Sequence, residues 1–162
     1  MLFADQAAAL ASAGADVLWF ETLHDRADAE AAREAARPTG TPYVLSFAPP
    51  MPHEDHEAIL RFAAMIAETT AAEPRPSALG VNCGAGPETA LRVIAAVAEV
   101  DLPLIARANA GLPELREHAV VYPFGPQEMA AFALSAKRLG ARIVGGCCGV
   151  DAAAIAAIAE TL

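Results

Sequence analysis

Near the end of the chain lies the stretch Arg142-Ile143-Val144-Gly145-Gly146-Cys147-Cys148-Gly149. Its first three residues are expected to form a short buried strand, and the two glycines that follow allow a tight turn of the backbone. Two adjacent cysteines come next, and a third glycine leads into a segment rich in Ala and Ile. The stretch therefore predicts a strand that ends in a pair of thiols and is followed by a helix.

A second stretch, Ala78-Leu79-Gly80-Val81-Asn82-Cys83-Gly84, has the same layout. Cys83, Cys147 and Cys148 are the three cysteines of the chain, and each follows a predicted strand. The carboxyl ends of parallel strands meet at one edge of a sheet or barrel. Because thiolates are metal ligands, the pattern favours a metal-dependent site at that edge.

The composition limits the class of protein. A chain of 162 residues is long enough for one domain, residues 1–162, that buries about two-thirds of its unfolded surface. Hydrophobic residues make up 55% and the mean hydropathy is +0.34, yet no run approaches the ~18 apolar residues of a membrane span. The first residues lack the features of a signal peptide, so we expect a cytoplasmic protein whose cysteines bind metal or act as nucleophiles. The net charge of −9 argues against nucleic acid or an anionic membrane as partner.

Five apolar runs predict strands, and Ala-rich helical segments separate them at a spacing of about thirty residues, the period of βαβ units. This alternation predicts an α/β fold with a parallel sheet. The predicted strands are Asp16–Thr22, Pro42–Phe47, Ala78–Cys83, Leu102–Arg107 and Arg142–Val144.

Between these strands, Asp5, Asp25 and Asp151 are predicted to cap the amino ends of helices, since a side-chain oxygen there accepts from free backbone N–H groups. A further helix is expected from about Glu54 to Thr70, after a Pro-rich loop that runs through Pro52. The segment that follows Gly111, as far as Pro126, is predicted to be irregular.

Four strings identify a family resemblance. Trp19-Phe20-Glu21-Thr22, Gly80-Val81-Asn82-Cys83, Asn109-Ala110-Gly111 and Gly145-Gly146-Cys147-Cys148-Gly149 occur in this order, and together they resemble the homocysteine S-methyltransferase family. The resemblance implies a (β/α)8 TIM barrel, of which this chain matches strands four to eight, a partial barrel of about five parallel βα units. The three amino-terminal units of the family barrel are absent from the sequence.

The resemblance also implies a zinc site. The family holds Zn²⁺ with one cysteine after strand six and a cysteine pair after strand eight, which match Cys83, Cys147 and Cys148. Zinc binding deprotonates a thiol that would otherwise titrate near ~8.5. Three thiolates and one open position are typical of a catalytic zinc, whereas a fourth protein ligand would make the site structural. The expected reaction is methyl transfer to zinc-bound homocysteine from betaine, S-methylmethionine, another sulfonium or a methyl-pterin.

Further candidate residues lie at strand ends. By the resemblance, Glu21 binds the amino group of homocysteine; an ordinary carboxylate at a helix amino end is the other interpretation. Asn82, Asn109 and Ser46 are candidate substrate-binding residues, and a purely local role at each strand end stays open.

Histidines are a weaker metal signal in this sequence. His53 and His56 occur in a Pro-rich stretch without a matching cysteine, which favours exposure to solvent over metal binding.

Two departures from the family pattern bear on function. The missing units carry an Asp-Gly motif that helps to bind the amino acid, and Gly149-Val150-Asp151-Ala152 stands where the family has Thr-Pro and a His. Five strands cannot close such a barrel, so bare edges are expected near Trp19 and Val144. Three explanations stay open: two copies associate as a homodimer, a separate chain supplies the missing units, or the sequence is a fragment of a longer protein or a truncated relative.

Three functions therefore stay open at this point. The chain is a zinc-dependent homocysteine S-methyltransferase, a non-catalytic zinc-binding relative that serves as a partner or regulatory subunit, or a structural module without metal.

Overall fold

The computed structural model describes residues 2–49 and 55–162. Helices and strands alternate along these residues, as the sequence predicts. The elements are α1 Leu2–Ser12, β1 Leu18–Leu23, α2 Arg26–Ala36, the 3-10 helix η1 Arg37–Thr39, β2 Tyr43–Phe47, α3 His56–Ala71, β3 Ala78–Cys83, α4 Pro87–Ala96, β4 Leu104–Ala108, β5 Glu114–Arg116, β6 Ala119–Val121, α5 Pro126–Arg138, β7 Ala141–Gly146 and α6 Ala152–Thr161.

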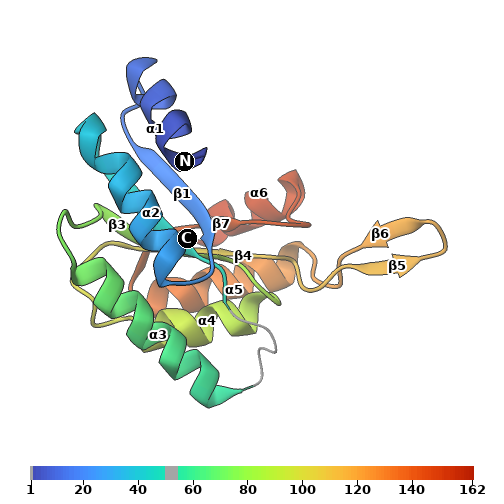
Figure 1. Cartoon of the computed structure of the whole chain (residues 1–162). Coiled ribbons are helices and arrows are strands. Elements are labelled where there is room, and N and C mark those ends of the chain that lie inside the picture. Colours follow the sequence, from blue (N-terminus) through green and yellow to red (C-terminus); the bar gives the residue numbers. More distant parts are fainter. Residues whose placement is uncertain (1, 50–54) are drawn as a thin grey trace.

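Five of the strands form one parallel sheet in the order β1-β2-β3-β4-β7. Each is one of the five strands predicted from the sequence, and the α/β class is confirmed. Because all five run in the same direction, their carboxyl ends lie along one edge of the sheet (Figure 1). The outermost strands are β1 and β7, the two that the sequence indicates as edges.

The outer face of the sheet is the face covered by helices. Along each strand, alternate side chains point to this face, and they pack with the apolar faces of successive helices, which contact one another from α1 to α6 (Figure 1). Fully buried members of this core are Leu45, Phe47, Leu79, Val81, Val93, Ile94, Met129 and Ala133. The outer face therefore holds the main hydrophobic core.

The inner face carries the other set of alternate side chains. Its apolar cluster among the described residues consists of Val44, Ala78 and Ile105. Trp19 on β1 and Ile143 on β7 lie toward the edges and are 36% and 47% exposed. This side of the sheet would face the interior of a closed barrel.

Helix caps agree with the sequence in two of three cases. Asp25 accepts from Asp28 N at 2.9 Å, and Asp151 accepts from Ala154 N at 2.8 Å. The predicted cap at Asp5 is wrong, because α1 begins at Leu2 and Asp5 lies inside its first turn, where a negative charge favours the positive end of the helix dipole. Helix α3 begins at His56, while the predicted start at Glu54 and the predicted loop residue Pro52 lie outside the described residues.

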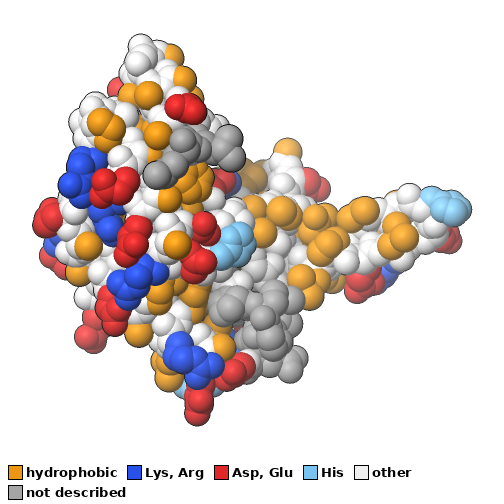
Figure 2. Space-filling view, viewed as in Figure 1, with side chains coloured by type: hydrophobic (Ala, Val, Ile, Leu, Met, Phe, Trp, Pro, Cys, Tyr) orange, Lys and Arg blue, Asp and Glu red, His pale blue; other side chains and the backbone are white. Residues whose placement is uncertain are grey.

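The segment predicted to be irregular instead contains an antiparallel hairpin. Strands β5 and β6 pair Leu115 with Val120, and the turn between them includes Glu117 with a φ of 56°. The hairpin projects from the body of the molecule (Figures 1 and 2). Its Leu115 and Val120 are exposed. Three-residue strands joined without a glycine turn give almost no pattern from which to predict them.

Candidate metal centre

The three cysteines meet at the carboxyl end of the sheet. Cys83 is the last residue of β3, and Cys147 and Cys148 directly follow β7. Their three sulfur atoms lie within 4.8 Å of one another, and the sulfurs of Cys147 and Cys148 are 3.9 Å apart. A tetrahedral zinc with bonds of ~2.3 Å sets its sulfur ligands about 3.8 Å apart. The donor set therefore fits a single zinc ion, as the sequence predicts.

The surroundings of Cys148 alter its ionisation. Partial burial, and after it the neighbouring Cys147 and Cys83 thiols, together raise the pKa of the Cys148 thiol to about 11. Negative charges this close together repel one another, so the metal-free protein keeps a proton on Cys148 at neutral pH. A bound divalent cation supplies the positive charge that would offset this repulsion.

The backbone around the cysteines has an unusual conformation and lies close to neighbouring side chains. Cys83 adopts a left-handed conformation with a φ of 63°, which is uncommon for a residue with a side chain. A Cβ at Gly146 would lie 2.3 Å from Cγ1 of Val150, and a Cβ at Gly149 would lie 2.2 Å from Cγ of Tyr122. The glycines on both sides of the cysteine pair are therefore required by packing.

Asn109 links the two cysteine loops. Its Nδ2 donates to the carbonyl oxygen of Gly84 at 2.8 Å and lies 3.6 Å from the Cys83 sulfur. Its Oδ1 accepts from the backbone N–H of Cys148 at 3.0 Å. The geometry therefore places Asn109 between the two loops that carry the cysteines, and its assignment as a substrate-binding residue stays a prediction.

Asn82 and Ser46 are both fully buried. The Oδ1 of Asn82 accepts from Ser46 Oγ at 2.6 Å and from Thr22 N at 3.2 Å, while its Nδ2 donates to Thr22 Oγ1 at 2.9 Å. These bonds tie together the carboxyl ends of β1, β2 and β3. Their assignment as substrate-binding residues stays a prediction.

Glu21 lies at the end of β1 and forms an ion pair with Arg107 of β4. The Nε of Arg107 donates to the carbonyl oxygen of Gly146 at 3.2 Å, and its guanidinium carbon lies 5.4 Å from the centre of the Trp19 ring. Sequence reasoning missed Arg107. The available signal was a single cation inside the apolar run of β4, where a charge needs a partner.

The histidines take no part in this site among the described residues. His56 is exposed at the start of α3, and His53 lies outside the described residues. Where the structure is described, the cysteine trio is the only group of three or more His, Cys, Asp or Glu side chains placed to share one metal ion.

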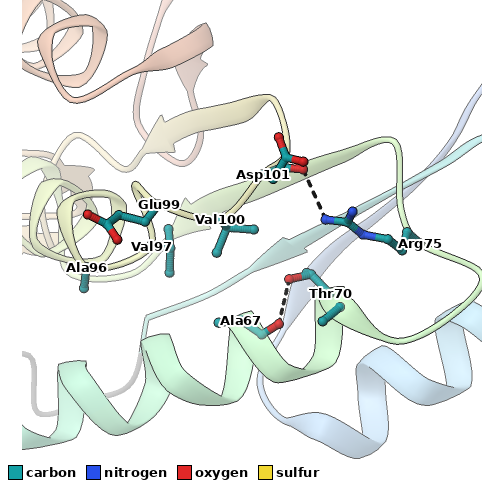
Figure 3. Close-up of a pocket in the computed structure, with 9 residues that line it drawn as sticks. Ala67, Thr70, Arg75, Ala96, Val97, Glu99, Val100 and Asp101 are labelled. Atoms are coloured by element: carbon teal, nitrogen blue, oxygen red, sulfur yellow. Dashed lines mark hydrogen bonds between the residues drawn. The ribbon is translucent and has the colours of Figure 1, made fainter.

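A separate cavity of about 340 Å³ lies at the opposite end of the sheet (Figure 3). It is lined by the ends of α3 and α4 and by the loops that precede β3 and β4. Two of its polar side chains are already used within the protein, since Arg75 donates to the carbonyl oxygen of Asp101 at 3.2 Å and Thr70 donates to that of Ile66 at 2.8 Å. Where the structure is described, no group of three or more His, Cys, Asp or Glu side chains placed to share a metal ion lines this cavity.

Comparison with known proteins settles the family. The sequence profile of the homocysteine S-methyltransferase family matches residues 1–162. The chain belongs to this family. The resemblance seen in the four sequence strings is thereby confirmed.

Two curated relatives show how much of a family protein this chain represents. It is 32% identical over 168 residues to a methionine synthase of Mycobacterium tuberculosis, covering 99% of this chain and 14% of that protein. It is 35% identical over 104 residues to an S-methylmethionine–homocysteine S-methyltransferase of Pongo abelii, covering 53% of this chain and 29% of that protein. The chain therefore spans less than a third of the length of either relative.

Solved structures agree on the fold. The carboxyl transferase domain of Rhizobium etli pyruvate carboxylase superposes with a TM-score of 0.60 at 16% identity, covering 94% of this chain and 24% of that one. A truncated 3-deoxy-D-arabino-heptulosonate 7-phosphate synthase of Thermotoga maritima gives a TM-score of 0.51 at 15% identity, with 90% and 44% covered. Together with the five-stranded parallel sheet, these matches confirm a partial (β/α)8 barrel.

No helix among the described residues is both long enough and apolar enough to cross a membrane.

Proposed function

We propose that this chain is the zinc-binding part of a homocysteine S-methyltransferase, which transfers a methyl group to the sulfur of homocysteine and yields methionine. The observation that carries the proposal is the cysteine trio, whose sulfurs lie within 4.8 Å of one another. Three protein ligands leave a fourth position for a substrate sulfur. Membership of the family over residues 1–162 supports this class of reaction.

In this proposal Cys83, Cys147 and Cys148 hold the zinc, and Asn109 fixes the two loops that carry them. A bound zinc would supply a substrate thiolate at neutral pH, where a free thiol with a pKa near ~8.5 is mostly protonated. The protein's own part is to hold the three sulfurs together at the carboxyl end of the sheet.

Glu21 is the proposed partner of the substrate's ammonium group. Its side chain is 40% exposed on the inner face, and Arg107 connects it to Gly146, which directly precedes Cys147. A substrate held at its sulfur and at its ammonium is oriented for attack on a methyl donor, and such orientation contributes several kcal/mol to rate.

We also propose that the inner face is covered in the functional protein, by a second copy of the chain or by a complementing chain that carries the three missing βα units. The exposed Trp19 and Ile143 support this proposal, and so does the small share of each relative that the chain represents. A completed interface would bury well over ~2,000 Å². Sedimentation of the purified chain tests it, since a stable monomer at micromolar concentration would contradict self-association.

The function is tested by methyl transfer to homocysteine from betaine, S-methylmethionine and S-adenosylmethionine, each with and without the amino-terminal units of a family relative. We expect transfer from at least one donor when those units are present, and Glu21→Ala should raise the homocysteine requirement while zinc content is unchanged. Homocysteine binding to the metal without transfer from any donor would instead indicate a non-catalytic zinc-binding relative. Failure of homocysteine to bind the metal would refute the substrate assignment.

A further inference from the structure

Arg107 lies between Glu21 and the loop that carries Cys147 and Cys148. Its Nε is bound to the carbonyl oxygen of Gly146, one residue before Cys147, and its Nη1 is bound to the Glu21 carboxylate. The guanidinium also stacks on Trp19 at 5.4 Å. One side chain therefore joins the cysteine loop on β7 to the carboxylate on β1, across the inner face of the sheet.

The guanidinium keeps unused donor capacity. A guanidinium has five N–H groups, and Nη2 of Arg107 has no hydrogen-bond partner among the described residues. The side chain is 28% exposed, so part of it is open to solvent. A planar guanidinium with a free edge is suited to bidentate binding of a carboxylate.

The Glu21–Arg107 pair is also complementary to one class of ligand. An α-amino acid carries an ammonium and a carboxylate on the same carbon atom, and the pair presents an anion and a cation side by side on the same face of the sheet. Because both side chains are partly exposed, the pair itself contributes little to stability. A zwitterion placed against it gives each of the four charges an opposite partner.

We propose that Arg107 binds the α-carboxylate of the amino-acid substrate, while Glu21 holds its ammonium; the inference rests on the proposed function. Arg107 is then a specificity-determining residue. It selects homocysteine over thiols that lack a carboxylate, and it does so from a position whose backbone bond to Gly146 holds it close to the cysteine loop.

The alternative is that Arg107 only neutralises Glu21 and packs on Trp19. The two roles differ in what they predict for substrate analogues. If Arg107 binds the carboxylate, its substitution weakens only the thiols that carry a carboxylate. If its role is structural, its substitution changes the affinity for all thiols alike.

The test uses the whole chain loaded with Co²⁺ in place of zinc, because the ligand-field absorption of cobalt changes when a thiol enters its coordination sphere. Three thiols are titrated: homocysteine, 3-aminopropane-1-thiol, which lacks the carboxylate, and 4-mercaptobutanoate, which lacks the ammonium. They are compared in the unmutated protein, in Arg107→Met and in Arg142→Met, a matched control on an exposed residue of β7. Circular dichroism and cobalt content verify that each variant is folded and loaded.

We expect Arg107→Met to weaken homocysteine and 4-mercaptobutanoate on the order of 10- to 100-fold, the effect of losing hydrogen bonds to a charged group. Binding of 3-aminopropane-1-thiol should stay the same or tighten, since Glu21 is released from its ion pair. Glu21→Gln should give the reverse pattern, weakening the two amine-containing thiols and sparing 4-mercaptobutanoate. Arg142→Met should change none of them.

Two results would overturn the assignment while leaving the proposed function intact: homocysteine affinity unchanged in Arg107→Met, or equal weakening of all three thiols. If none of the three thiols alters the cobalt spectrum of the unmutated protein, the proposed function itself fails, and the role of Arg107 fails with it.

Discussion

The two faces of the sheet are built on different principles. On the outer face, Leu45, Phe47, Leu79 and Val81 are fully buried beneath helices. On the inner face of the same strands, the apolar cluster among the described residues consists of Val44, Ala78 and Ile105, and a charged pair runs from β1 to β4. The comparison teaches that one face supplies most of the stability of this partial barrel, whereas the other face and the adjoining strand ends carry the charged pair and the cysteines on which the proposed function rests.

If this division is correct, substitutions at the cysteine edge should remove the metal without unfolding the chain. We expect Cys83→Ala, Cys147→Ala and Cys148→Ala each to lose or severely weaken zinc, because two remaining thiolates no longer make a catalytic ligand set. Metal analysis of the purified variants measures this loss, and X-ray absorption of the unmutated protein should show sulfur ligands near ~2.3 Å. Full zinc occupancy in any one variant would remove that cysteine from the ligand set.

Substitutions at two isoleucines test this division through the stability of the chain. Ile94 of α4 is fully buried against the outer face, whereas Ile143 on the inner face is 47% exposed. Ile94→Ala should lower the free energy of unfolding by about 2–5 kcal/mol, through lost burial and the cavity that remains.

The control is Ile143→Ala, which should cost less than about 1 kcal/mol because half of its side chain already contacts solvent. Denaturant unfolding of both variants provides the measurement. Equal losses would show that the inner face is packed as tightly as the outer one and would contradict the comparison.

Removal of the hydrogen bonds around the sulfurs should have an intermediate effect on metal affinity. Asn109→Ala removes the hydrogen bonds to Gly84 and Cys148 that hold the two loops together. Loss of such positioning bonds typically weakens metal affinity by about 10- to 100-fold. Competition with a zinc chelator measures the change, and Asn82→Ala, which alters a neighbouring network without touching the sulfurs, is the control for general disturbance of the strand ends.

The smallest effect on the isolated chain is expected at Trp19. This side chain is 36% exposed at the edge of the inner face, so Trp19→Ser should change the unfolding free energy by less than about 1 kcal/mol beyond the loss of its stacking on Arg107. Its effect should appear in association instead. Sedimentation equilibrium should show weaker self-association, or weaker binding of a complementing amino-terminal chain, and unchanged association would place the interface elsewhere.

The sequence predicts the elements of the outer face well and the details of the inner face poorly. The five strands are visible because each is a continuous apolar run, and Asp25 and Asp151 cap their helices through local bonds that depend on nearby residues alone. The cysteine trio is visible because all three residues follow strands whose ends must meet. Such features are local, or they follow from the parallel topology.

Features that depend on contacts between distant residues were not visible. Arg107 and Glu21 are separated by 86 positions, and no pattern in either strand indicates that they pair. The part of Asn109 in linking Gly84 to Cys148 depends on how three loops are placed together. The hairpin of β5 and β6 was missed for the opposite reason, since its strands are local but too short to give a period.

The left-handed backbone at Cys83 has a consequence for how this chain changes over evolution. With a φ of 63°, a residue with a side chain costs about 1–2 kcal/mol at this position relative to glycine. In a descendant in which the sulfur had no use, Cys83→Gly would be favoured by stability alone, and the sulfur would be among the first features lost. Retention of this cysteine is therefore expected for as long as its sulfur serves the proposed zinc site.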